Sequence, residues 1–219
     1  MRGKSRHARP HARRGGDVNA VVGLLLAAGR GRRFGSDKLM HRMPDGMPIA
    51  VASARRLASA TDRTVAVVRP HQTALCKALA ALGVELVEAA DADHGMGNTL
   101  AAGIRATQQA DGWVVALGDM PCVLQDTVRQ VAQALRGGAS IAAPFHLGQR
   151  GHPVGFARQW LDTLLQLAGD EGARHLLRAN GTAITRIGVD DPGCLFDVDT
   201  LRDIEQMHTM SPPTIKGQT

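Results

Sequence analysis

The stretch from Gly29 to Lys38 combines positive charge with very small side chains. It reads GRGRRFGSDK and follows directly on an apolar run. Glycine lets the backbone adopt positive φ angles and approach a ligand closely, and successive amide groups in such a loop can form a concave site for an anion. Arg33 and Lys38 add fixed positive charge. The combination predicts a loop that binds a polyphosphate.

Two common phosphate loops do not fit this spacing. Gly29, Gly31 and Gly35 are spaced GxGxxxG, one residue longer than the dinucleotide fingerprint GxGxxG. Lys38 is flanked by aspartate and leucine, whereas the P-loop requires a glycine before its lysine and a serine or threonine after it. The spacing therefore argues against an NAD-binding protein and against a P-loop NTPase.

Three aspartates are candidate ligands for a divalent cation. Asp119 lies in LGDMP, directly after a predicted buried strand, and Asp197 and Asp199 lie in FDVDT. Mg²⁺ prefers carboxylate and phosphate oxygens. Alternation along a strand would place Asp197 and Asp199 on one side, where they repel unless a cation or good solvation intervenes. A purely structural role stays open, with Asp119 capping one helix and Asp199 or Thr200 capping another.

Two further segments carry polar residues beside glycines. In HGMGNTL, Gly95 and Gly97 allow close approach, and Asn98 or Thr99 can hydrogen-bond a ligand or cap the next helix. GQRGHPVGF and the later GDEGAR supply Arg150, His152 and Arg174. For each of these three residues, a solvated or structural role is as good an explanation as a binding role when it is considered alone.

These residues need elements that bring them together. Apolar and β-branched runs predict strands at 18–28, 64–69, 84–89, 113–117 and 140–145, and helical periodicity predicts helices at 48–60, 71–82, 99–110 and 124–136. The alternation indicates a parallel sheet with helices on both faces and right-handed crossovers. Ligands bind beyond the C-terminal strand ends of such sheets. The loops at 29–38, 91–99 and 118–121 all follow strands, so we expect them at one edge.

The alternation ends after residue 145. LGQRGHPVGF indicates a hairpin or extended loop, followed by helices at 159–168 and 172–179, a strand at 183–189 and a last helix at 200–208. No internal repeat or second domain is evident. We predict one domain over 18–209, a disordered basic tail over 1–17 and a frayed end over 210–219.

Composition narrows the functional class. Six of the 26 basic residues lie in 1–14, which holds no acid, so the other 20 match the 20 acidic residues and the body is about neutral. Aromatic residues make up only 3%, which argues against a nucleic-acid stacking surface. The apolar run after the basic start resembles a secretory signal, but cleavage there would remove the first strand. It is too short to span a membrane. Three scattered cysteines favour a reducing cytoplasm.

The motif series resembles a known family. LAAGRGRRFGSDK, HGMGNTL, LGDMP, RGHP and GDEGAR are similar, in this order over about residues 20–208, to nucleotidyltransferases with a glycosyltransferase-A-like Rossmann fold. Within these, they resemble the molybdenum-cofactor nucleotidyltransferases (MobA-like NTP transferases), and their molybdopterin cytidylyltransferase branch in particular. The resemblance implies an α/β, three-layer Rossmann-like fold of the nucleotide-diphospho-sugar transferase type, with a mainly parallel central sheet.

The resemblance also implies residue roles. Arg33, Lys38 and Asp119 would be catalytic, with Mg²⁺ as cofactor held by Asp119 and by Asp197 and Asp199. The nucleotide-binding residues would be Leu26, Ala27, Ala28, Gly29, Gly31, Arg33, Gly35, Lys38, Gly95, Asn98 and Thr99. Arg150, His152 and Arg174 would contact the acceptor.

The implied reaction is transfer of CMP from CTP to the terminal phosphate of molybdopterin, with release of pyrophosphate. Ala28 stands where guanylyl-transferring relatives more often have glycine, and its Cβ would narrow the pocket in favour of cytosine. A molybdenum hydroxylase would receive the product, with no nucleic acid or membrane as partner. The alternatives are a related transferase that uses GTP or UTP with another phosphorylated acceptor, and a non-catalytic carrier of the molybdenum cofactor.

Overall fold

The structure is a computed structural model that describes residues 20–29, 34 and 37–210, with the side chains of 208–210 excepted. Gly31, Arg33 and Gly35 of the predicted phosphate loop lie outside the described residues. So do the predicted basic tail and most of the predicted frayed end.

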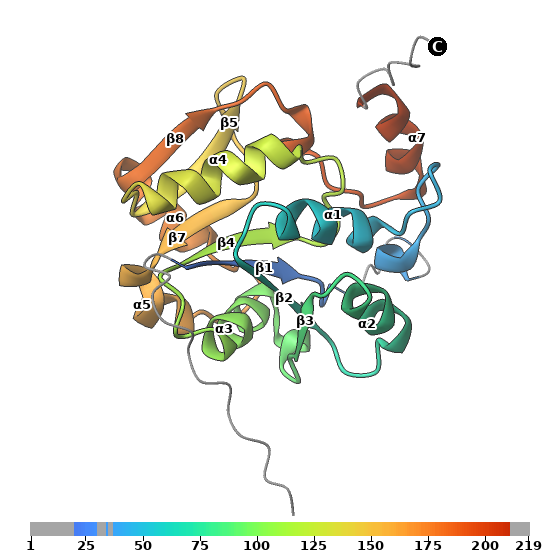
Figure 1. The fold of residues 1–219 in the computed structure, drawn as a ribbon, viewed down its shortest axis with the longest axis horizontal. Helices are drawn as coiled ribbons and strands as arrows, with labels where there is room; N and C mark the ends of the chain where they lie inside the picture. Colours follow the sequence, from blue (N-terminus) through green and yellow to red (C-terminus); the bar gives the residue numbers. More distant parts are fainter. Residues whose placement is uncertain (1–19, 30–33, 35–36, 211–219) are drawn as a thin grey trace, which may run out of the picture.

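An eight-stranded mixed sheet forms the centre of the described part of the chain (Figure 1). Its strands are β1 Val21–Leu26, β2 Arg63–Val68, β3 Glu85–Glu88, β4 Gly112–Leu117, β5 Ile141–His146, β6 Gln149–Arg150, β7 Val154–Ala157 and β8 Ile184–Gly188. The order is β3-β2-β1-β4-β7-β5-β6, and β8 pairs with β5. Pairing is parallel from β3 through β4 and between β5 and β8. The expected mainly parallel sheet is therefore confirmed.

The antiparallel strand β7 was not predicted from the sequence. The segment predicted as a hairpin or extended loop makes a tight turn at Leu147 and Gly148 and pairs β6 back onto β5. The chain then continues into β7, which inserts between β4 and β5 and runs antiparallel to both. Val154, Gly155 and Phe156 of β7 are buried there. The interior of the sheet therefore gains a strand from a segment whose sequence resembles a loop.

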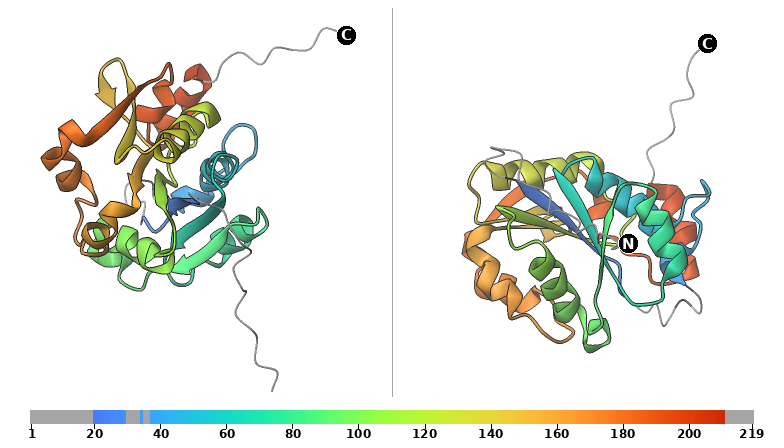
Figure 2. Two further views of the ribbon diagram at one scale, coloured as in Figure 1. Left: turned by 60° about the vertical axis from the view of Figure 1, so that its left-hand side comes forward. Right: turned by 60° about the horizontal axis from the view of Figure 1, so that its bottom comes forward.

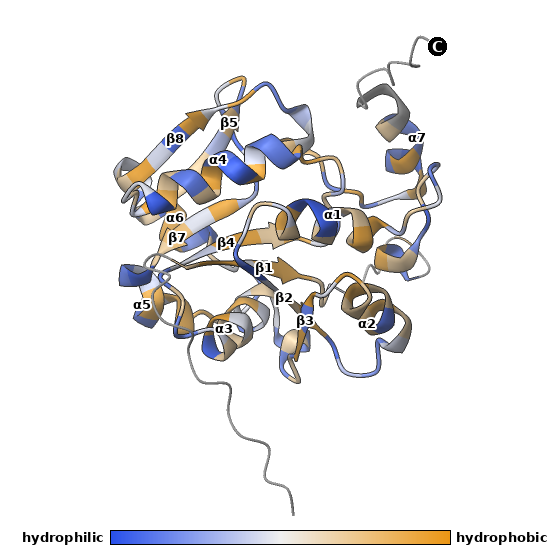
Figure 3. Cartoon of the chain, in the orientation of Figure 1, coloured by the Kyte–Doolittle hydropathy of each residue, from blue (hydrophilic) through white to orange (hydrophobic). Residues whose placement is uncertain are grey.

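Helices cover both faces of the sheet (Figures 1 and 2), as expected. Along β1, Val21 and Leu25 join a core cluster with α1 Ile49–Ala58, α2 Thr73–Ala80 and α4 Gln125–Arg136. Val22, Leu24 and Leu26 face the opposite cluster with α3 Met96–Ala106, α5 Leu161–Leu165 and α6 Arg174–Ala179. In Figure 3 β1 is hydrophobic along its length, as a strand buried on both faces requires.

The last helix, α7 Leu201–Met210, packs away from the sheet. Ile204 and Met207 of α7 form a third apolar cluster with Phe34, Met43 and Ile49, and the cluster also contains Val198. This packing returns the C-terminal segment to the beginning of the domain. It therefore determines where the acidic FDVDT segment lies.

Some local predictions were wrong. The helix expected at 159–168 is reduced to a 3₁₀ turn and the short α5. Residues 196–199 are not a strand, although Asp197 and Asp199 still approach each other. At the start of α7, the Asp203 carboxylate accepts hydrogen bonds from the backbone N–H groups of Asp199 and Thr200, at 2.8 and 2.6 Å. Among the described residues, no helix combines the length and apolar character needed to cross a bilayer.

Candidate active site

Lys38 lies at the centre of a cluster of three carboxylates. Its Nζ donates hydrogen bonds to Asp119 Oδ2 at 2.8 Å and to Asp199 Oδ1 at 3.0 Å. The lysine is buried, with 8% of its surface exposed. One ligand atom each from Asp119, Asp197 and Asp199 lies within 4.8 Å of the others. The structure thus brings Lys38 together with the three aspartates that were predicted as cation ligands.

Backbone contacts position Asp119. β4 ends at Leu117, and the next residue, Gly118, donates its N–H to Leu26 O of β1 at 2.9 Å. A Cβ on Gly118 would lie 3.1 Å from the same oxygen. Buried Ser53 of α1 donates to Gly118 O at 3.1 Å. Asp119 therefore projects from a turn attached to both β1 and α1, and it caps no helix.

A second set of contacts positions Asp197 and Asp199. The backbone N–H of Val198 donates to Asp119 O at 2.9 Å, and the Val198 side chain is fully buried. The flanking Asp197 and Asp199 are more exposed than Val198, and each has a carboxylate oxygen within 4.8 Å of the one from Asp119. Upstream, Gly193 packs so closely on the backbone of Cys122 that a Cβ would lie 2.2 Å from Cys122 O.

We expect Gly193→Ala to destabilise the fold by about 1–3 kcal/mol, because either the 192–199 segment or the turn after Asp119 must move. The matched control is Gly188→Ala, since a Cβ there meets nothing within 4 Å. Urea denaturation of both variants gives the free energies of unfolding. Equal stability of the two variants would contradict the close packing.

The electrostatics of the cluster favour a divalent cation. Burial lowers the pKa of Lys38, but Asp119 and Asp199 together raise it by more, so the net pKa lies above the ordinary value and the side chain is an ammonium. Burial, followed by Asp199 and Asp119, raises the pKa of Asp197. In the described part of the chain, three carboxylates lie close together and one ammonium pairs with two of them. A set of carboxylate oxygens of this kind fits Mg²⁺.

A cavity of about 140 Å³ adjoins Lys38 and Asp119. From the predicted nucleotide-binding set its wall includes Leu26, Ala28, Gly29 and Thr99, and it also includes Leu39, Ala92, Met96 and Leu117. The Ala27 side chain is not part of this wall, because it is fully buried in the core cluster on the α1 side of the sheet.

The HGMGNTL loop binds another part of the chain. Gly97 N–H donates to Gly169 O at 2.8 Å, and Gly169 N–H donates to Asn98 Oδ1 at 2.9 Å. A Cβ on Gly95, whose φ is +120°, would lie 2.3 Å from the Gly169 carbonyl. Capping by Asn98 or Thr99 is wrong, because α3 begins earlier, after Gly95, and has no side-chain cap. The glycines allow approach of backbone 168–170, a reason that the sequence analysis did not consider.

Two of the predicted acceptor residues, Arg150 and Arg174, are within electrostatic range of each other and of a further arginine, Arg178. Burial lowers the pKa of Arg150, and the charges of Arg174 and Arg178 lower it further. Arg174 and Arg178 are one turn apart on α6, so they lie on the same face. Among the described residues, no carboxylate forms an ion pair with any of these three arginines. Unpaired converging guanidinium groups are suited to an anion.

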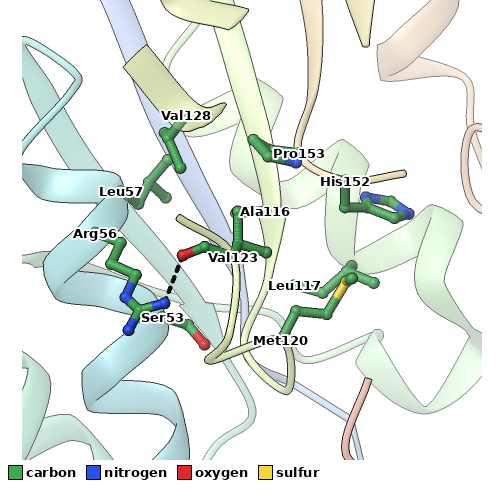
Figure 4. Close-up of a pocket in the computed structure, with 10 residues that line it drawn as sticks. All are labelled: Ser53, Arg56, Leu57, Ala116, Leu117, Met120, Val123, Val128, His152 and Pro153. Carbon is green, nitrogen blue, oxygen red and sulfur yellow. Dashed lines mark hydrogen bonds between the residues drawn. The ribbon is translucent and has the colours of Figure 1, made fainter. Parts of the chain in front are cut away.

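His152 is within electrostatic range of both Arg150 and Asp119. Burial, followed by the charge of Arg150, lowers its pKa to about 4, and Asp119 and Arg174 also contribute, in opposite directions. Its Nδ1 is buried without a hydrogen-bond partner in the described part of the chain. In Figure 4 the imidazole lines a small cavity and points away from Ser53 and Arg56 at the other end. His152 is therefore neutral at physiological pH.

The pKa of His152 predicts acid sensitivity. The folded pKa of about 4 lies below the ordinary value of 6.5, so below about pH 6.5 the unfolded chain binds a proton that the folded chain does not. Between about pH 7.5 and about pH 5 the wild type should lose about 2 kcal/mol more unfolding free energy than His152→Gln. Urea denaturation of both proteins at the two pH values measures this difference. Parallel losses in both proteins would show that His152 keeps its ordinary pKa when folded.

Comparison with known proteins decides the family. Residues 23–184 match the family described as MobA-like NTP transferase domain. The chain belongs to this family. The motifs quoted above therefore identified the family correctly, and the MobA-like fold accounts for the mainly parallel sheet.

Curated relatives extend the match over most of this MobA-like chain. The purine catabolism protein PucB of Bacillus subtilis is 27% identical over 197 residues, which cover 85% of this chain and 95% of that protein. Nicotine blue oxidoreductase of Paenarthrobacter nicotinovorans is 28% identical, with 89% and 98% covered. A probable molybdenum cofactor guanylyltransferase of Thermococcus gammatolerans is 32% identical over 110 residues, which cover 49% of this chain and 53% of that protein.

Solved structures resemble the fold over a similar extent. Rv0371c from Mycobacterium tuberculosis is 28% identical, has a TM-score of 0.75, and covers 86% of this chain and 97% of its own. A complex of the same mycobacterial protein with manganese has a TM-score of 0.71 at 27% identity and covers 86% and 98% of the two chains.

The MobA-like domain has further candidate site residues that were not predicted from the sequence. Arg69 follows β2 at the same sheet edge as the phosphate loop, and its Nη2 donates to Gly29 O at 3.4 Å. Its position at the end of a predicted strand could have indicated a cation at this sheet edge. Arg178 could also have been found, because it lies four residues after Arg174 on a predicted helix and so on the same face. Met96, 44% exposed in the cavity wall, carries no such signal because methionine occurs more often in cores.

Proposed function

We propose that this chain is a nucleotidyltransferase that transfers CMP from CTP to the terminal phosphate of molybdopterin and releases pyrophosphate. The observation that carries the proposal is the convergence of Lys38 and three carboxylates beside a cavity at the C-terminal strand ends. Membership in the MobA-like NTP transferase family supports the reaction class. The relative named as a probable molybdenum cofactor guanylyltransferase supports the acceptor class.

The reaction needs little proton chemistry. An oxygen of the acceptor phosphate attacks the α-phosphorus of CTP, and the bond from that phosphorus to the bridging oxygen of the β-phosphate breaks. Pyrophosphate leaves with the electron pair, and the product is the cytosine dinucleotide form of the cofactor. A phosphate monoester is already anionic at neutral pH. No histidine is required as a base, and His152, whose pKa is lowered to about 4, would be a weak one.

The chain contributes position and charge. Lys38 pairs with phosphate oxygens whose negative charge increases as pyrophosphate leaves. Arg150, Arg174 and Arg178 would hold the anionic acceptor so that it meets the α-phosphate in line. Asp119, Asp197 and Asp199 would hold Mg²⁺, which withdraws charge from the triphosphate and assists departure of pyrophosphate. The manganese complex of Rv0371c supports a divalent ion in this fold.

The choice of cytosine rests on Ala28, which is 5% exposed and lines the cavity. A methyl group at this position narrows the space for the base and favours the smaller pyrimidine. A purine needs more room, so we expect Ala28→Gly to raise the relative rate with GTP.

The test is incubation of the protein with molybdopterin, Mg²⁺ and each of the four α-labelled NTPs, followed by detection of pyrophosphate and identification of the labelled dinucleotide. We expect product with CTP. Product with GTP or UTP alone would overturn the base assignment and retain the transferase class. Tight molybdopterin binding without pyrophosphate from any NTP would identify a cofactor carrier instead.

A further inference from the structure

Lys38 occupies the position that a cation would need between two of the three carboxylates. The ammonium is within hydrogen-bond distance of both Asp119 and Asp199, at 2.8 and 3.0 Å. A second cation that bound the same two oxygens would have to lie close to this ammonium. At such separations, like charges in a partly buried site repel each other strongly.

The lysine is held on two sides. Two carboxylate oxygens lie 2.8 and 3.0 Å from its Nζ, and 8% exposure keeps it largely out of solvent. A divalent ion that uses these two oxygens displaces it. It must therefore move, and a buried ammonium moves only to another anionic partner. The cavity beside it, lined by Gly29 and Ala28 of the phosphate-loop side, is where a triphosphate would supply that partner.

We propose that Lys38 is the counter-ion of the metal-binding carboxylates in the nucleotide-free protein, so that the divalent ion is taken up together with the nucleotide and not before it. The inference rests on the proposed function and adds an order of binding to it. Binding of the triphosphate draws Lys38 away from Asp119 and Asp199 and frees their oxygens for the ion. In the absence of nucleotide, Lys38 keeps the affinity for divalent ions low.

The test is the affinity for Mn²⁺, measured by electron paramagnetic resonance of the free ion without nucleotide. We expect Lys38→Met to bind Mn²⁺ at least about tenfold more tightly than the wild type. The matched control is Lys77→Met, which removes the same charge from an exposed position on α2 and should leave the affinity unchanged. Lys38→Arg keeps the charge and should bind Mn²⁺ no more tightly than the wild type.

Two further measurements identify the site and the coupling. Asp197→Asn in the Lys38→Met background should abolish the gain, because Asp197 belongs to the carboxylate cluster and makes no hydrogen bond with Lys38 in the structure. A non-reactive CTP analogue with a methylene group between the α- and β-phosphorus should tighten Mn²⁺ binding more in the wild type than in Lys38→Met. If Lys38→Met does not fold, as judged by circular dichroism, Lys38→Gln replaces it with the same expectation.

Unchanged or weaker Mn²⁺ binding by the Lys38 variant would overturn the inference. An equal gain in Lys77→Met, or a gain that survives Asp197→Asn, would also overturn it. These results are independent of the proposed reaction, because Mn²⁺ affinity without nucleotide requires no turnover. A protein that produced no pyrophosphate from any NTP but showed the gain would retain the counter-ion role and lose the transferase assignment.

Discussion

Replacement of Asp119 by asparagine is expected to lower the turnover number about 10²–10³-fold, equivalent to about 3–4 kcal/mol of transition-state stabilisation. Asparagine keeps the shape of the side chain and removes its charge. The remaining carboxylates then hold a divalent ion less well, and Lys38 loses its 2.8 Å partner. The effect should fall on the turnover number more than on KM for the nucleotide, because the lost charge matters most as pyrophosphate leaves.

The measurement is the steady-state rate of pyrophosphate release with saturating CTP, molybdopterin and Mg²⁺. Asp162→Asn is the matched control, since Asp162 is exposed on α5 and away from the carboxylate cluster. We expect the wild-type rate from the control. A wild-type turnover number in Asp119→Asn would show that Asp119 does not act in the reaction.

Lys38→Met is expected to lower the turnover number by a similar factor, about 10²–10³-fold. Among the described residues, Lys38 is the basic residue that forms ion pairs with the carboxylate cluster. Methionine has a similar length and no charge. Without the ammonium, the charge that develops on the departing pyrophosphate lacks one of its partners. The rate of pyrophosphate release, measured at several Mg²⁺ concentrations, separates this loss of turnover from a change in affinity for the ion.

Lys38→Arg distinguishes charge from geometry. Arginine keeps the positive charge, but its planar guanidinium group does not replace a compact ammonium between two carboxylates. We therefore expect partial activity, between the wild type and Lys38→Met. Full activity in Lys38→Met at saturating Mg²⁺ would mean that the lysine is needed for neither chemistry nor charge balance.

Local patterns were sufficient for the outline of this protein. Continuous apolar runs predicted buried parallel strands, because a strand covered on both faces has no polar side. The strand β1 and the buried strand before Asp119 were predicted in this way. The family could be identified because glycines and cations at a fixed spacing form one contiguous loop, and contiguous residues keep their spacing in any fold.

Local patterns failed where backbone from a distant segment decides the structure. Nothing near Val154 indicates insertion between β4 and β5, because that strand gains its partners only when the sheet assembles. Likewise, Asn98 resembles a helix cap in sequence, but its side chain binds Gly169, 71 residues later. Tertiary contacts outweigh local preference in such cases because each buried backbone group must find a hydrogen-bond partner somewhere.

The chemistry of the site divides in the same way. Residue types alone identified Lys38, Asp119, Asp197 and Asp199 as candidates, since only a few side chains can neutralise a phosphate or hold a hard cation. Their mutual arrangement was beyond sequence reasoning, because Lys38 lies 81 residues from Asp119 and 161 from Asp199. Packing of α7 against Phe34 and Ile49 closes that separation. Only the folded chain shows that the lysine pairs with the carboxylates, since this requires apolar contacts distributed over the whole domain.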